Sequence, residues 1–184
     1  MAGGEMTWHA NYVALPVGMR DFSGTSLIAQ AEFSREFSST GFSLGAGYFG
    51  SRADPDDPAG EALLTENNTR DYDVLNLQLQ HRSTVLGRPL RLGAEYGRNV
   101  RDYSQAPAGS FSEFHQNHVD GWVLEALWGR SGDAGDLLVG YYYSHMEALS
   151  ANSSYIQDDW ARWGTSTQAR LTNMKGSEFR VLFT

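Results

Sequence analysis

Apolar and polar residues alternate along most of this chain, in short segments separated by polar links. Leu75, Leu77 and Leu79, for example, are separated from one another by single polar residues. A period of two is typical of a β-strand with one apolar and one polar face. Nine segments show it, over residues 7–15, 27–34, 42–49, 75–80, 90–97, 122–129, 137–144, 165–172 and 177–184. The chain is therefore predicted to be all-β, with one domain over residues 1–184.

The links between these segments alternate between short and long. Short links are predicted near residues 36–41, 82–89, 130–136 and 173–176, and long links near 16–24, 51–70, 101–120 and 147–164. Barrels of the outer membrane have tight turns at one end and long loops at the other. In a sandwich with Greek-key crossings, short and long links are not expected to alternate. The pattern favours an antiparallel up-and-down transmembrane β-barrel, with about eight to ten strands here as part of a larger barrel.

The two faces of the predicted strands differ in chemistry. One face carries aliphatic and aromatic residues and hardly any charge in the central strands, as a lipid-facing surface requires, because an arginine facing mid-bilayer lipid costs about 2–4 kcal/mol. The other face is polar and suits a wet lumen. Its charged members are the candidate pore-lining residues Glu32, Arg91, Glu95, Glu125, Arg170, Glu178 and Arg180. These charges either set a field across a pore or pair with one another and stiffen its wall.

Aromatic residues stand near the ends of the apolar face. Trp122 and Trp128 are about 20 Å apart at the usual rise of a strand. This separation fits two aromatic girdles at the membrane interfaces. The predicted interface aromatics are Tyr48, Tyr96, Trp122, Trp128 and Tyr143. Ordinary core aromatics of a soluble protein are the alternative interpretation.

The composition narrows the classes of function. The chain has 184 residues, a net charge of −8 and no cysteine, so thiol chemistry is excluded and a general nucleic-acid binder is disfavoured. No apolar run is long enough for a transmembrane helix. Lys175 is the only lysine, although soluble β-proteins commonly place lysine on exposed strands. The outward faces are therefore expected not to meet water.

We find no catalytic constellation and expect neither an enzyme nor a cofactor. Ser144 and His145 are neighbours on a strand, so they point to opposite faces and cannot pair. His115 and His118, with Glu113 nearby, lie in a predicted loop where no strand or helix fixes their spacing, so a metal site is not expected. The acidic segment 54–57 lacks the spacing of a calcium loop and is expected to be solvated.

Several segments together resemble a porin family of Gram-negative outer membranes. They are residues 42–49 (FSLGAGYF), 92–99 (LGAEYGRN), 120–124 (DGWVL), 136–148 (DLLVGYYYSHMEA) and 158–160 (DDW). The resemblance spans roughly residues 27–184 and implies the C-terminal part of a water-filled barrel in the outer membrane. Its partners would be lipid, lipopolysaccharide and small polar solutes or ions, with a homo-oligomer left open. The residues before Thr7 show no secretory signal, so we expect either that a signal has been removed or that the chain is a C-terminal portion.

Three functions remain open. The first is a pore for passive diffusion, and the second is an outer-membrane barrel that transports nothing and binds a partner through its long loops. The third is a soluble β-barrel or sandwich that binds a ligand. Lumen width separates the first two, since small barrels are filled by side chains and wide ones conduct.

Overall fold

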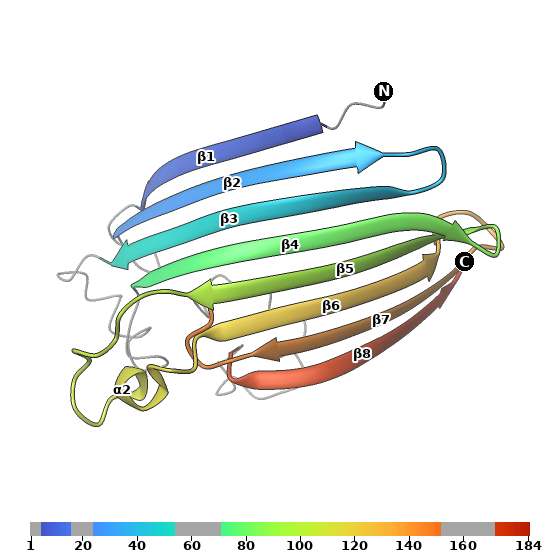
Figure 1. Cartoon of the computed structure of the whole chain (residues 1–184). Helices are drawn as coiled ribbons and strands as arrows, with labels where there is room; N and C mark the ends of the chain where they lie inside the picture. The colour runs from blue at the N-terminus through green and yellow to red at the C-terminus, as the bar shows by residue number, and fades with distance from the viewer. Residues whose placement is uncertain (1–4, 16–23, 54–70, 152–171) are drawn as a thin grey trace.

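The strands form one antiparallel sheet in which each strand pairs with its neighbours in sequence. The computed structural model describes residues 5–15, 24–53, 71–151 and 172–184. Within these ranges the sheet has eight strands in the order β1 to β8 (Figure 1). They are β1 (Glu5–Leu15), β2 (Gly24–Glu36), β3 (Gly41–Ala53), β4 (Tyr72–Val85), β5 (Arg88–Asn99), β6 (Asp120–Gly129), β7 (Leu137–Met146) and β8 (Met174–Phe183). The prediction of an all-β, antiparallel up-and-down sheet is confirmed.

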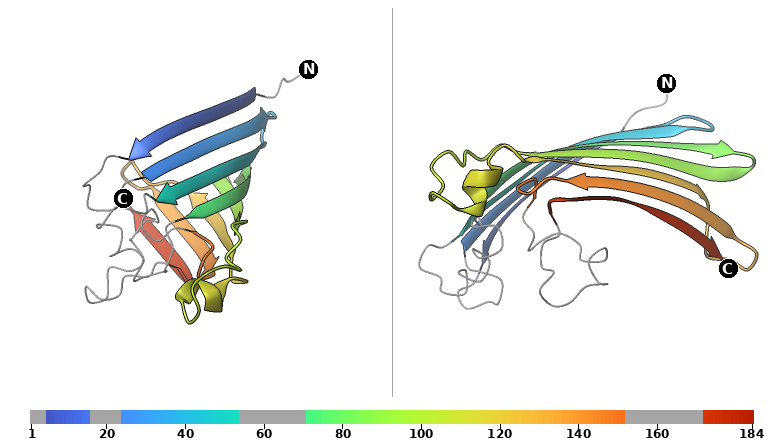
Figure 2. Two further views of the ribbon diagram at one scale, coloured as in Figure 1. Left: turned by 90° about the vertical axis from the view of Figure 1, so that its left-hand side faces the viewer. Right: turned by 90° about the horizontal axis from the view of Figure 1, so that it is seen from below.

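The sheet is open rather than closed into a barrel. Figure 2 shows it as an arc, with β1 and β8 at its two ends. These two strands pair only with β2 and β7 respectively among the strands that the structure describes. The strands thus follow the predicted up-and-down order, while a closed barrel is not present in this structure.

The last part of the chain departs from the predicted strand boundaries. The strand predicted over residues 165–172 lies outside the described residues, apart from Thr172. The predicted turn at 173–176 is wrong, because β8 already begins at Met174, and Lys175 and Gly176 pair with His145 and Ser144 of β7. Only Asn173, with a φ of 58°, has a backbone conformation typical of a turn. The last strand therefore begins directly after Asn173.

Short and long links lie at opposite ends of the sheet, as predicted. Leu86 and Gly87 alone connect β4 to β5, with positive φ angles of 53° and 72°. A two-residue turn with positive φ at both positions matches the right-handed twist of the flanking strands. The longer links that the structure describes in full or in part, such as 100–119, gather at the other end (Figure 1).

The register keeps apolar residues beside apolar residues across the sheet. Leu44 pairs with Leu79, which pairs with Ala94, which in turn pairs with Leu124. Because side chains alternate between faces, the neighbouring polar positions also form continuous rows on the opposite face. We call the two surfaces the apolar face and the polar face.

Buried hydrophobic residues gather at the long-link end and not under either face of the sheet. In the described ranges they are Tyr72, Tyr103, Val119, Ala148 and Leu149. Asn99, 1% exposed, lies at the centre of this cluster. Its side-chain oxygen accepts hydrogen bonds from the backbone N–H groups of Asp73 and Arg101, and its amide donates to Tyr103 Oη and the Leu149 carbonyl. This one side chain joins the end of the sheet to two of the long links.

The link between β5 and β6 contains a short helix, α2 (Phe111–His115). The Ser110 hydroxyl accepts a hydrogen bond from the Glu113 backbone N–H and caps the first turn. The prediction that His115 lies in a loop was therefore wrong, because this residue ends α2, whereas His118 lies beyond the helix. Across the described part of the chain, every helix is too short or too polar to cross a membrane.

Candidate functional site: the polar face of the sheet

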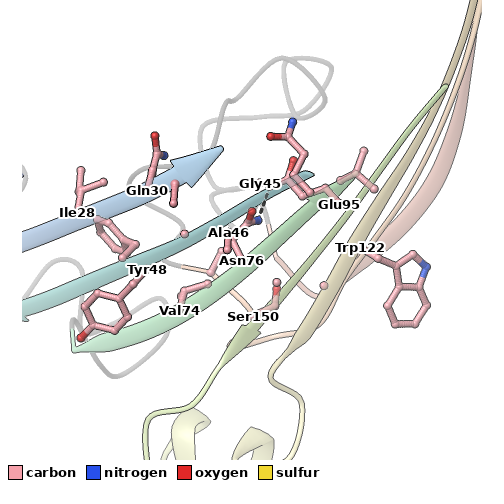
Figure 3. A pocket seen from close by; sticks show the side chains of 18 of the residues that line it. Ile28, Gln30, Gly45, Ala46, Tyr48, Val74, Asn76, Glu95, Trp122 and Ser150 are labelled. Carbon is pink, nitrogen blue, oxygen red and sulfur yellow. Dashed lines mark hydrogen bonds between the residues drawn. The ribbon is translucent and has the colours of Figure 1, made fainter. Parts of the chain in front are cut away.

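The polar face borders a hollow with a volume of about 640 Å³. Figure 3 shows side chains from β2 to β6 around it, among them Gln30, Asn76 and Glu95. Glu32 and Gln78 also line it, as does Ser150 of the link after β7. The hollow therefore lies on the concave side of the arc, and its lining offers amide, hydroxyl and carboxylate groups to a solute.

The predicted pore-lining residues that the structure describes all belong to this polar face. They are Glu32, Arg91, Glu95, Glu125, Glu178 and Arg180, while Arg170 lies outside the described residues. The register sorts them into rows across the sheet. Arg91 and Arg180 share one row through Leu127 and Gly140, which we call the arginine row.

Two further rows carry the carboxylates. The first of these rows contains Glu125 and Glu178, with Tyr142 between them, and lies next to the arginine row on the polar face. The second contains Glu32 and Glu95, with Gly45 and Gln78 between them, and is the next polar-face row toward the long-link end. The sequence predicted these charges on one face, and the register adds that opposite signs lie in adjacent rows.

Adjacent rows are linked by ion pairs. Arg91 Nε lies 2.7 Å from Glu125 Oε1, and Arg180 Nη2 lies 2.7 Å from Glu178 Oε1. The Arg180 guanidinium also lies over the Tyr142 ring, 5.5 Å from its centroid. Both pairs are partly exposed on the polar face of the sheet, so they hold the side chains along this face without burying their charge.

Sequence reasoning missed two polar contacts of this face. Arg82, which belongs to the arginine row through its pairing with Arg91, forms an ion pair of 3.3 Å with Glu36. Asn76 Nδ2 donates to Glu95 Oε1 at 2.6 Å (dashed line in Figure 3). Both contacts join residues on different strands, so only the register brings them together.

Gly140 lies beside Leu127 on the polar face, where a larger residue would clash with the leucine side chain. A Cβ atom at Gly140 would lie 2.7 Å from Leu127 Cδ2 on the neighbouring strand. That distance is far below a normal carbon contact. The missing side chain of Gly140 thus makes room for Leu127 between Arg91 and Arg180.

The predicted interface aromatics all belong to the apolar face by register. Tyr48, Tyr96 and Trp122 are near the long-link end, and Trp128 is near the short-turn end. Tyr143 pairs with Leu124, which is the next apolar-face position after Trp122, further from the end of the sheet. Aromatic side chains thus stand toward both ends of this face.

Polar partners hold several of these rings. The Tyr48 and Tyr96 hydroxyls donate to the carboxylates of Asp73 and Asp120, and Trp128 Nε1 donates to the Val85 carbonyl. Trp122 stacks on His145, with ring centroids 4.3 Å apart. An apolar ring with a paired polar tip is the chemistry found at membrane–water interfaces.

Charges on the apolar face lie near its two ends, with Arg35 and Arg88 at the short-turn end. Two ion pairs lie at the long-link end. Arg52 pairs with Asp73 at 2.8 Å, and Arg98 pairs with Asp120 at 3.0 Å. The same aspartates accept the tyrosine hydroxyls, so two neighbouring hairpins repeat one Tyr–Asp–Arg arrangement. Sequence reasoning missed both arrangements. The adjacency of Arg98 to the predicted Tyr96 was the only available signal.

The described side chains that were considered for catalysis or metal binding lie in two places, on β7 and at the C-terminal end of α2. Ser144 lies on the polar face, while the His145 ring stacks on Trp122 of the apolar face. His115 and His118 approach each other, with 3.1 Å between their Nδ1 atoms. In the ranges that the structure describes, no three residues of the metal-ligating types gather. The acidic segment 54–57 lies outside those ranges.

Comparison with known proteins adds no relative: no family model, no curated protein and no solved structure matches this chain.

Proposed function

We propose that this chain forms part of the wall of an outer-membrane pore for passive diffusion of ions or small polar solutes. The apolar face of the sheet would contact lipid, and the polar face would line the lumen. The resemblance of several segments to a Gram-negative porin family supports this proposal. The surroundings we propose are outer-membrane lipid and lipopolysaccharide.

The observation that carries the proposal is the exposure of the apolar face. Leu75, Leu77 and Leu79 of a central strand are 49%, 55% and 51% exposed. Other strands add Leu27, Phe33, Leu44, Leu92, Leu124, Tyr141, Phe179 and Val181, which are also exposed. Soluble monomers rarely expose a contiguous apolar surface of this extent. Lipid is the surrounding that such a surface, flanked by aromatic residues, fits best.

The polar face supports a wet lumen rather than a packed interior. It carries glutamine, glutamate, arginine and glycine together with apolar residues such as Val74 and Val123, and its ion pairs are partly exposed. Barrels of eight strands are filled by side chains, while those of sixteen or more leave an aqueous channel. The open arc fits the wall of a wide barrel better than a tightly closed one.

One observation favours the second function, a barrel that binds a partner through its loops and transports nothing. Asn99 and the buried cluster around it order the link 100–119 and the start of the link after β7. Ordered links at the proposed extracellular end offer a fixed surface to a partner. We keep this alternative as an outcome of the test.

Planar-bilayer recording tests the proposal. The full-length protein is refolded in detergent and added to a bilayer, with heat-denatured protein as the control. We expect discrete conductance steps that scale with salt concentration. Insertion without steps, shown by protease protection in vesicles, would favour the partner-binding barrel. A protein that stays monomeric in detergent-free buffer and does not bind to vesicles would contradict the membrane assignment itself.

A further inference from the structure

We propose that the polar face makes the pore prefer cations over anions, and that Glu32 and Glu95 carry this preference. The inference rests on the proposed pore, whose substrate class it names. It follows from which charges of the polar face are paired and which are not.

The arginines of the polar face are each neutralised by a glutamate. On the described strands these arginines are Arg82, Arg91 and Arg180, which share the arginine row. They pair with Glu36, Glu125 and Glu178 at 3.3, 2.7 and 2.7 Å. At the distance of a passing solute, each pair acts as a dipole of nearly zero net charge.

Among the residues whose side chains the structure describes, two carboxylates remain after this pairing. Neither Glu32 nor Glu95 has an arginine or lysine within ion-pair distance in the part of the chain that the structure describes. They share one row, separated by Gly45 and Gln78, which places them about 14 Å apart at the usual strand spacing. Both line the hollow.

The surroundings of these two residues keep their charge available to the lumen. Both side chains are exposed on the polar face. Asn76 donates a hydrogen bond to Glu95 and fixes its position without cancelling its charge. Gly45 and Gln78 between them add no charge of either sign. The row is therefore a negative stretch of the wall.

The expected size of the effect follows from Coulomb's law. A carboxylate about 7 Å from the ion path, in water at about 0.1 M salt, favours a monovalent cation over an anion about threefold. Two carboxylates together then give a permeability ratio of roughly seven.

Reversal potentials across a KCl gradient test the inference, with the full-length protein in planar bilayers. We expect the wild type to favour potassium over chloride, and Glu32→Gln and Glu95→Gln each to lower the ratio about threefold. Gln78→Glu adds a carboxylate to the same row and should raise it by a similar factor. Lys175→Gln removes a charge from the apolar face and should leave it unchanged.

Three results would overturn the inference. Conductance steps with a wild-type ratio of one or below would refute cation preference and leave the pore standing. A ratio that does not change in Glu32→Gln and Glu95→Gln would assign the preference to other residues. Absence of steps in the wild type would refute the pore and the inference together.

Discussion

Arg91 and Glu125 bridge β5 and β6 on the polar face through two hydrogen bonds. Arg91 Nε and Nη2 donate to the two carboxylate oxygens of Glu125, at 2.7 and 3.1 Å. The Arg91 side chain is 45% exposed, so solvent screens the pair. It therefore determines the charge of the wall more than the stability of the sheet.

Separating this pair should change ion preference in opposite directions. Arg91→Gln leaves Glu125 unpaired and should raise the preference for potassium, while Glu125→Gln leaves Arg91 unpaired and should lower it. Each substitution should cost less than about 1 kcal/mol of unfolding free energy, as exposed ion pairs do. Reversal potentials and urea titrations measure the two effects. A shift of the ratio in the same direction in both variants would contradict this account.

Asn99→Ala should detach the long links from the end of the sheet. The side chain makes four hydrogen bonds in a buried position, and its loss leaves buried groups unsatisfied. We expect a loss of about 3 kcal/mol and faster proteolysis within residues 100–119. Asn76→Ala, which removes an exposed amide bonded to Glu95, is the matched control and should cost below about 1 kcal/mol. Equal losses in the two variants would argue against the central position of Asn99.

Leu86→Asn should stabilise the turn between β4 and β5. Leu86 has a φ of 53° and is 88% exposed, so it bears a backbone cost without burying its side chain. Asparagine adopts this conformation more readily, and we expect a gain of about 0.5–1 kcal/mol. Gly87→Ala, at a φ of 72° with open space around it, should lose about 1 kcal/mol. Urea unfolding measures both, and destabilisation by Leu86→Asn would contradict the assigned turn.

Asp136 should make the sheet sensitive to acid. The Asp133 backbone N–H, at 3.0 Å, and Arg130 Nε, at 2.9 Å, hold the pKa of this carboxyl below its ordinary value of 3.8. Because the pKa is lower in the folded state, the stabilisation is fully present above the ordinary pKa of the unfolded chain. It is lost as the pH falls through the folded-state pKa. Asp136→Asn should therefore flatten the decline in stability between about pH 4 and pH 2. An unchanged decline would show that other groups cause it.

The alternation of residues was enough to predict the central strands and their two faces. Leu75, Leu77 and Leu79 belong to one face in the sequence and in the structure, because a period of two admits only one assignment of faces once a strand is formed. The grouping of the charged candidates on the polar face followed from the same parity.

Other features depend on information that the alternation does not contain. The pairing of Arg82 with Glu36, and the position of Asn99 among two links, need the register between strands. The turn predicted at 173–176 failed because Lys175 and Gly176 are turn-like residues that neighbouring β7 holds in an extended conformation. The helix α2 was predictable, since Ser110 and Glu113 have the spacing of a helix cap.

Single-cysteine labelling at Leu77 and Gln78 tests most directly whether the apolar face meets lipid. The chain has no cysteine, so Leu77→Cys and Gln78→Cys each give one labelling site, on opposite faces of β4. An environment-sensitive fluorophore is attached to each, and the proteins are refolded into vesicles that contain brominated lipid. We predict quenching by the lipid at position 77 and quenching by aqueous iodide at position 78. Iodide quenching at position 77 without lipid quenching would contradict the central claim.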